Sequence, residues 1–498
     1  MTSPSAPSPS APAGAAPPPF RKGDSAEFDV ADLAFGGRAI ARVGGYVVFI
    51  DGALPGDRVE ARVYRRKPHY AEARTERIVA PSADRVPAVC SHTGICGGCR
   101  MQDLAYDVQL LHKERQVAEC LQHLGGIAAT IRPIVRAERT FGYRNKMEYS
   151  FGRDPEGRLT LGLHRRGFFD RPFDLERCHI AGSRSSDVVA CVRDLARAEG
   201  MTHYDTRRHE GLLRYLVVRE GRRTDQMMVN IVASETHPAF DRWADVIRER
   251  FPAVRSILLN TTRRRSQVAI GDEERVLWGS DRIEETLYGL TFEISSSSFF
   301  QTNSEQAERL LDAALEGLGL GNGDGAGGGG ANSGGTGGAP AEARYLDLYS
   351  GTGTFTLPIA RRVREVIGIE SNEAAVRDAE RNAARNGIAN ATFWAGEAME
   401  LLRDRLGLGG RDATLPGDRP EIAGVLVDPP RAGLHPGVVT GLVRLGAPRL
   451  VYVSCNPATL GRDLAALCEE RYRVEWVQPV DMFPHTPHIE CVASLVRR

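Results

Sequence analysis

The chain has 498 residues, of which 42% are hydrophobic and 26% charged, and its formal net charge at pH 7 is zero. This length indicates roughly three domains. A membrane-spanning protein is excluded, because no uncharged apolar run reaches the about 18 residues that a spanning helix needs.

Residues 1–20 are rich in Pro, Ala and Ser and lack both the basic start and the apolar stretch of a signal peptide. We predict a disordered tail there. The chain has nine cysteines, an odd number without a signal sequence. This indicates a reducing compartment, the cytoplasm, with thiols used for metal binding or catalysis.

Residues 21–80 show short alternating segments, at 26–30, 46–50 and 57–63, separated by Gly-Gly, Asp-Gly and Pro-Gly pairs. Short strands with such turns predict a small β-barrel of the oligonucleotide-binding kind.

Basic residues gather in three places although the net charge is zero: residues 58–77, residues 132–171 and the run Arg263-Arg264-Arg265. Aromatic residues that could stack on unpaired bases lie among the first two groups: Tyr64, His69, Tyr70, Phe141, Tyr143 and Phe168. The pattern favours RNA as a partner.

Residues 81–290 mix helix and strand patterns around a cysteine cluster. Four of these cysteines could bind a metal together: Cys90, Cys96, Cys99 and Cys178. Four thiolates suit tetrahedral zinc or a four-iron cluster, and spacing alone does not separate the two. The other cysteines outside the C-terminal motifs are expected in the core: Cys120, Cys191, Cys468 and Cys491.

The third predicted domain, residues 291–498, contains a glycine-rich insertion at 318–340. Beyond it, strands alternate with helices. The predicted strands lie at 345–349, 365–369, 392–394, 424–427, 450–453, 473–478 and 489–496, and the first two helices at 354–363 and 373–386. This alternation predicts an α/β fold with a doubly wound, parallel, Rossmann-like sheet.

The segment Leu346–Phe355 runs from a strand into a glycine turn and a helix, which is typical of a nucleotide-type cofactor site. Glu370 ends the next strand, where a carboxylate can accept hydrogen bonds from ribose hydroxyls, and Asp428 ends a later one. A dinucleotide site needs a third glycine where Thr356 stands. S-adenosylmethionine, which has no pyrophosphate, fits the turn better.

Cys455 follows the apolar segment 451–454 and precedes Asn456 and Pro457, where a helix begins. It is thereby placed at the carboxyl edge of the sheet, where open α/β sheets bind ligands. We expect the helix N-terminus to lower the pKa of this thiol, which makes Cys455 a candidate nucleophile.

Several blocks closely resemble signature motifs of the RNA 5-methyluridine methyltransferases: residues 299–303, 346–355, 428–433, 454–463 and 481–490. The N-terminal barrel resembles the TRAM domain of that family, and the cysteine cluster resembles its iron–sulfur site. The resemblance runs from about residue 21 to 498, apart from the insertion, and is strongest to the enzymes of 23S ribosomal RNA.

The resemblance implies that Cys455 is the nucleophile and Glu490 the base. It implies that S-adenosylmethionine is bound by Gln301, Tyr349, Glu370 and Asp428. It also implies a [4Fe-4S] cluster on Cys90, Cys96, Cys99 and Cys178 in a monomeric enzyme. Ser350 and Thr354 stand where relatives often carry Cys and Asn, which affects only details of cofactor contact.

Alternative functions are a transfer-RNA methyltransferase of the same chemistry and a non-catalytic iron–sulfur RNA-binding protein. An amino-group methyltransferase would carry an aromatic residue where Arg431 follows Asp428-Pro-Pro. A 5-methylcytosine enzyme would differ in motif order, and a radical S-adenosylmethionine enzyme would leave Cys178 without a role.

Overall fold

The computed structural model describes residues 19–168, 170–265, 269, 271–321, 343–406 and 422–498. Nearly all of the predicted tail and of the predicted glycine-rich insertion lies outside these ranges. The chain divides into two compact units. The first comprises Met1–Val89, Cys99–Gln116 and His485–Pro487, and the second Cys90–Gly98, Val117–Pro484 and His488–Arg498.

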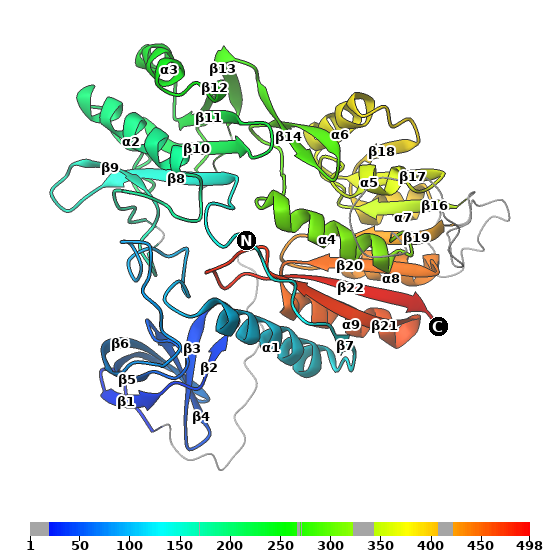
Figure 1. Cartoon of the computed structure of the whole chain (residues 1–498), viewed down its shortest axis with the longest axis horizontal. Coiled ribbons are helices and arrows are strands. Elements are labelled where there is room, and N and C mark those ends of the chain that lie inside the picture. The colour runs from blue at the N-terminus through cyan, green and yellow to red at the C-terminus, as the bar shows by residue number, and fades with distance from the viewer. Residues whose placement is uncertain (1–18, 169, 266–268, 270, 322–342, 407–421) are drawn as a thin grey trace. The chain divides into compact units, whose positions relative to one another are not determined.

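The first unit contains a six-stranded sheet, drawn in blue in Figure 1, with the order β1-β5-β6-β4-β3-β2. Its strands are β1 (Ser25–Asp29), β2 (Asp32–Ala34), β3 (Arg38–Val43), β4 (Tyr46–Asp51), β5 (Arg58–Arg66) and β6 (Tyr70–Ala80). Alternate residues of β5, such as Val59 and Val63, are fully buried. The three strands predicted from the sequence correspond to β1, β4 and β5.

The second unit begins with a mixed sheet of order β13-β12-β11-β10-β8-β9. Its strands are β8 (Lys146–Arg153), β9 (Leu159–Gly162), β10 (Leu213–Gly221), β11 (Gln226–Ala233), β12 (Val254–Thr261) and β13 (Glu273–Gly279). Helix α2 (Ser183–Ala198) packs on β9 and β10, and α3 (Ala239–Arg250) packs on β12 and β13. The hairpin β14 (Arg282–Leu287) and β15 (Leu290–Ser295) leads into the C-terminal half.

The C-terminal half is built on an eight-stranded sheet of order β18-β17-β16-β19-β20-β22-β21-β7. Its strands are β16 (Arg344–Leu348), β17 (Glu365–Glu370), β18 (Ala391–Ala395), β19 (Ile422–Val427), β20 (Arg449–Ser454), β21 (Tyr472–Val480), β22 (Glu490–Arg497) and β7 (Thr130–Ile131). Strands β16 to β20 are parallel, whereas β22 is antiparallel to both β20 and β21. The predicted doubly wound α/β fold is confirmed, but the sheet is mixed and gains the unpredicted strand β7.

Helices cover both faces of this sheet (Figure 1). The helices on one face are α4 (Ser304–Gly317), α5 (Thr356–Ala360) and α6 (Glu373–Arg385), and those on the other are α7 (Ala398–Asp404), α8 (Pro436–Leu445), α9 (Pro457–Glu470) and the second half of α1 (Tyr106–Gly125). Each face has its own apolar core. The strands are buried on both sides, as parallel strands usually are.

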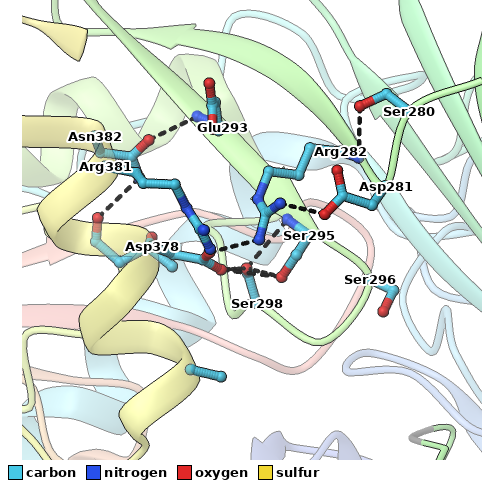
Figure 2. A network of polar contacts seen from close by, with 12 residues as sticks. Ser280, Asp281, Arg282, Glu293, Ser295, Ser296, Ser298, Asp378, Arg381 and Asn382 are labelled. Atoms are coloured by element: carbon cyan, nitrogen blue, oxygen red, sulfur yellow. Dashed lines mark hydrogen bonds and ion pairs between the residues drawn. The ribbon is translucent and has the colours of Figure 1, made fainter. Parts of the chain in front are cut away.

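A buried carboxylate on α6 holds the segment that follows β15 (Figure 2). The Asp378 side chain is 3% exposed and accepts hydrogen bonds from the hydroxyls of Ser295 (3.0 Å) and Ser298 (2.5 Å). Arg381 and Arg282 approach the same carboxylate at 2.7 and 3.3 Å. Asp378 thereby links α6 to the hairpin and to the loop beyond it.

Asn382, one helical turn further along α6, extends this link to the C-terminal sheet. Its side-chain carbonyl accepts the backbone N–H of Glu293 (2.8 Å), and its amide donates to the carbonyl of Thr352 (3.2 Å). The Thr352 hydroxyl in turn donates to the carbonyl of Phe299 (3.4 Å). Helix α6 therefore holds the loop after β15 against the glycine turn after β16.

Substitution Asp378→Asn should loosen this loop at neutral pH, by about 2–3 kcal/mol of local opening free energy, because charge-assisted hydrogen bonds are lost. Burial acts to raise the pKa of Asp378, but the hydrogen bonds from Ser298, Arg381 and Ser295 outweigh it and hold the pKa below 3.8. The ionised carboxylate thus stabilises the fold above about pH 4, and its contribution is lost as the pH falls through the lowered pKa.

Hydrogen exchange of the backbone amides from 292 to 300 measures this opening directly. The exposed Glu380, on the opposite face of α6, supplies the control variant Glu380→Gln. Equal exchange in the two variants at pH 7 would contradict the role given to Asp378.

Candidate active site

The residues singled out in the C-terminal motifs meet at one edge of the large sheet. Tyr349 follows β16, Glu370 ends β17, Asp428 follows β19 and Cys455 follows β20. Because these strands are parallel, their carboxyl ends lie side by side. Strand β22 runs the opposite way and begins at Glu490, so its first residue lies at the same edge.

The turn after β16 is shaped by left-handed backbone conformations. Gly351 and Gly353 have φ of 53° and 87°, and Tyr349 has φ of 68°, which is costly for a residue with a side chain. The backbone N–H of Gly351 donates to Glu370 Oε2 (3.1 Å). A Cβ added at Gly351 would meet no atom within 4 Å, so this face of the turn leaves room for a ligand.

Buried oxygens beneath the turn lack partners among the described residues. They are Asp347 Oδ1 and Ser350 Oγ. Burial raises the pKa of Asp347 to about 7; a hydrogen bond from Thr356 opposes this, whereas Asp428 and Glu370 add to it. Burial also raises the pKa of Asp428 to about 7. Crowded, poorly solvated carboxyl groups of this kind favour a cationic ligand, and S-adenosylmethionine, a sulfonium, is one.

The loop after β15 brings two further side chains to the C-terminal half. Gln301 is 7% exposed, and its backbone carbonyl accepts the side-chain amide of Asn145 (2.9 Å). Phe299, whose carbonyl accepts the Thr352 hydroxyl, is 65% exposed. Sequence reasoning named Gln301 but gave Phe299 no role. A large exposed aromatic side chain beside a cofactor turn is a signal that only the structure provides.

The register between β20 and β22 sets Cys455 beside Glu490. Ser454 pairs with Cys491 across the two antiparallel strands, so Cys455, which follows Ser454, lies at the level of Glu490, which precedes Cys491. Glu490 also pairs with Val480 of β21, which fixes it from its other side. Its side chain is 8% exposed.

The thiol of Cys455 is surrounded by two carboxyl groups and one guanidinium. Burial raises its pKa to about 11; Glu490 and Asp428 add to this, whereas Arg431 opposes it by its charge and by a hydrogen bond. The expectation that the helix N-terminus lowers the pKa is therefore wrong for the unliganded chain, because burial and nearby carboxyls outweigh the helix. Burial and Asp428 raise the pKa of Glu490 well above its usual range, against the effect of Arg431.

The loop that carries Arg431 is tied to the start of α9. The Asn456 side-chain amide donates to the carbonyl of Arg431 (3.2 Å), and the N–H of Leu434 donates to the buried carboxylate of Asp463 (2.7 Å). Gly433 has φ of 80°, and a Cβ there would stand 2.4 Å from Asp463 Oδ2. These ties hold Arg431 next to Cys455. Sequence reasoning had used Arg431 only to exclude another enzyme class.

Three of the four cysteines of the cluster belong to the second unit. Cys90, Cys96 and Cys178 interact electrostatically, and the Gly98 N–H donates to Cys96 Sγ (3.4 Å). Cys99 belongs to the first unit. Among the residues that the structure describes, no group of three or more His, Cys, Asp or Glu is arranged to hold a metal ion.

The aromatic residues proposed for stacking differ in exposure. Tyr64 and Phe168 are 36% and 37% exposed. Tyr143 is buried and donates its hydroxyl to the carbonyl of Pro484 (3.0 Å), so the expectation is wrong for this residue. Its position beside basic residues in the sequence gave no sign of this burial.

Comparisons with known proteins identify the family of this chain. The profile of the tRNA (Uracil-5-)-methyltransferase family matches residues 339–498, and the TRAM domain profile matches residues 19–75. A curated protein of Chlorobaculum tepidum, described as an uncharacterized RNA methyltransferase, is 37% identical over 96% of this chain and 97% of its own. A protein of Gloeobacter violaceus with the same description is 38% identical over 96% of this chain and 97% of its own.

A solved structure is similar over most of the chain. It is the crystal structure of Pyrococcus abyssi tRNA (uracil-54, C5)-methyltransferase in complex with S-adenosyl-L-homocysteine. It matches with a TM-score of 0.71 and 29% identity, and covers 94% of this chain and 99% of that one. Among the described residues, no helix is long and apolar enough to cross a membrane. With its TRAM domain, its cofactor turn and these relatives, the chain belongs to the S-adenosylmethionine-dependent RNA (uracil-5-)-methyltransferases.

Proposed function

We propose that this enzyme methylates carbon 5 of a uridine in RNA, in the first place 23S ribosomal RNA, through a covalent adduct with Cys455. The observation that carries the proposal is the register of β20 and β22, which sets the thiol of Cys455 beside the carboxyl group of Glu490. The guanidinium of Arg431, on the loop after β19, lies near the same thiol.

Cys455 acts as the nucleophile. Carbon 5 of uracil is too poor a nucleophile to attack a methyl donor unaided. Addition of the thiolate to carbon 6 breaks the 5,6 double bond and makes carbon 5 electron-rich. The thiol is neutral in the unliganded chain, so its proton must leave before the addition. The guanidinium of Arg431 stabilises the resulting thiolate.

Glu490 acts as the base. Once carbon 5 carries the methyl group, it also holds a proton next to a carbonyl. The carboxylate of Glu490 removes this proton, the 5,6 double bond forms again, and the bond between sulfur and carbon 6 breaks. Burial raises the pKa of Glu490, and a higher pKa makes its carboxylate a stronger base once it is ionised.

Gln301, Tyr349, Glu370 and Asp428 are proposed to bind S-adenosylmethionine, which supplies the methyl group when bound. Glu370 lies at the end of β17. Its carboxylate accepts hydrogen bonds from the backbone N–H groups of Gly351 and Asn372, at 3.1 and 2.8 Å. Its carboxylate is thus held where it can also accept ribose hydroxyls. The partnerless oxygens of Asp347 and Ser350 beneath the turn support a polar, positively charged occupant.

Cys90, Cys96, Cys99 and Cys178 are proposed to hold a [4Fe-4S] cluster. The donor chemistry fits, because thiolates are soft ligands and repel one another unless a cationic group lies between them. The hydrogen bond from the Gly98 N–H to Cys96 Sγ is of the kind that stabilises cluster thiolates. The cluster has no step in the proposed reaction.

The identity of the RNA is tested by mapping 5-methyluridine in ribosomal and transfer RNA from cells with and without this protein. Loss of the modification from 23S RNA alone supports the first candidate. Transfer RNA is the second candidate, because the similar P. abyssi enzyme acts on tRNA. Loss from neither RNA would refute the proposed function.

We place the enzyme, as a monomer, in the cytoplasm, where its thiols stay reduced.

Substitution Cys455→Ala should reduce methyl transfer below about one per cent of wild type, because removing such a group costs several powers of ten in rate. S-adenosylmethionine affinity, measured by calorimetry, should stay within a few-fold of wild type, since the thiol acts only on the base. Cys468→Ala, at the far end of α9, is the control. Substantial turnover by Cys455→Ala would exclude the covalent mechanism.

Substitution Glu490→Gln should permit methylation but block proton removal, so that enzyme and methylated RNA remain joined. A denaturing gel with labelled RNA would show a band of reduced mobility. The double variant with Cys455→Ala should lack that band. Free methylated product at the normal rate, without a joined species, would remove Glu490 from this role.

Protein purified without oxygen should contain iron and sulfide in equal amounts. Cys178→Ser should lower both, because three thiolates hold a cluster less well than four. Cys191→Ser, at another buried cysteine on α2, should not. Elemental analysis that found zinc and no iron would overturn the cluster assignment.

A further inference from the structure

Three loop segments lie at one end of the sheet β8–β13 and carry exposed basic side chains. They are residues 164–168 with 170 and 171, residues 203–210, and residues 262–265, and together they are called the basic surface below. They are far apart in the sequence. Specific contacts hold them together.

Two arginines make these contacts. Arg207 forms an ion pair with Asp170 (2.5 Å), which joins the second segment to the first. The Arg214 guanidinium lies 4.2 Å from the centroid of the Tyr204 ring and donates to the carbonyls of Thr262 (3.1 Å) and Arg264 (2.7 Å). Through these contacts Arg214 joins the second segment to the third. Arg214 itself is buried, at 3% exposed.

Exposed arginines dominate this surface: Arg165, Arg171, Arg207, Arg208, Arg263, Arg264 and Arg265. The carboxylates among the three segments are fewer: Asp170, Asp205 and Glu210. Asp205 is occupied by the backbone N–H groups of Arg207 and Arg208. No salt bridge joins Arg208, Arg263 or Arg265 to a described residue, although the charge of Arg208 helps to lower the pKa of Asp205. The side chains of all three arginines are exposed.

An aromatic side chain accompanies these charges. The Arg171 guanidinium lies 4.4 Å from the centroid of the Phe168 ring, and Phe168 is 37% exposed. Aromatic and guanidinium planes stack on bases, and guanidinium groups also bind phosphates bidentately. An acidic protein would also match the charge, but it would not need the exposed ring.

The basic surface lies far from the chemistry. Strand β10 starts beside it at Leu213 and ends at Gly221, and nine residues at about 3.3 Å each span roughly 26 to 30 Å. At the far end of β10, Arg219 donates to the carbonyls of Ser296 (3.1 Å) and Ser298, in the loop that leads to Phe299. The length of β10 thus separates the basic surface from the loop that leads to Phe299, and we expect the surface to meet RNA remote from the target base.

The cysteine loop supports the first segment of this surface. The N–H of Gly97 donates to the carbonyl of His164 (3.0 Å), the N–H of Arg166 donates to the carbonyl of Ile95 (2.8 Å), and Cys96 forms a β-bridge with Arg165. The position of Arg165 thus depends on the fold of the cysteine loop.

We propose that the basic surface binds the phosphate backbone of substrate RNA at a distance from the target uridine, as a second anchor that selects large, folded RNA. The proposal rests on the function proposed above and names a contact surface for its substrate. The backbone contacts would raise affinity without reading sequence, since phosphates are the same in every RNA.

The test combines Arg208→Glu, Arg263→Glu and Arg265→Glu in the full-length protein. The matched control combines Arg248→Glu, Arg377→Glu and Arg473→Glu, whose side chains are 42%, 59% and 60% exposed elsewhere on the second unit. Both variants change the net charge equally. The probes are an unmodified transcript of a folded 23S ribosomal RNA domain, a short stem-loop with 5-fluorouridine in its loop, and polyglutamate, each at two salt concentrations.

The test variant should bind the transcript about tenfold or more weakly than the control, with a salt slope lower by about two to three, one for each lost phosphate contact. Adduct formation with the short stem-loop should be the same in both variants. Equal affinities and salt slopes for the transcript would overturn the proposal, and tight binding of polyglutamate would reassign the surface to acidic proteins. Failure of the proposed function appears separately, as an absent adduct in the wild type.

Discussion

The antiparallel pairing of β22 with β20 is the constraint on which the site depends. Parallel strands alone bring Tyr349, Glu370, Asp428 and Cys455 to one edge, where Asp428 already acts on the thiol by its charge. The reversed last strand begins at that edge, and its register with Ser454 brings in Glu490. A shift of one residue would turn Glu490 to the opposite face of the sheet. Pairing with β21 on the other side makes such a shift costly.

The electrostatics of the site follow from this crowding. Asp347, Asp428, Glu490 and the Cys455 thiol all have raised pKa values, with burial as the leading cause. For the thiol, the raised pKa favours the protonated form. A cationic cofactor and the guanidinium of Arg431 both favour the ionised forms.

Local sequence patterns predicted the regular elements of the C-terminal domain well, because buried parallel strands are apolar runs bounded by turn residues. The failures have tertiary causes. Helix α5 ends at Ala360, short of the predicted residue 363, where the Asn390 side chain donates to the carbonyls of Ala360 and Val363 (both 2.8 Å). The two-residue strand β7 exists only because β21 offers it an edge. Neither has a local signal.

In the site, too, features with a local sequence signal were predicted and features with tertiary causes were not. Motif positions placed Cys455, Glu490 and Glu370 at strand ends, where the structure has them, because strand ends are local features. The raised pKa of Cys455 could not be predicted, since it depends on carboxyl groups brought from other strands. The position of Arg431 depends on hydrogen bonds from α9, and the exposure of Phe299 on the support of α6. Such contacts between distant segments require the structure.

The central claim is that the methyl group replaces the hydrogen on carbon 5 of uridine. It is tested most directly with RNA labelled with tritium at carbon 5 of its uridines. The account predicts that one tritium is released to water for each methyl group transferred, and that Cys455→Ala releases none. Methyl transfer with tritium fully retained in the RNA would place the methyl group on another atom and contradict the account.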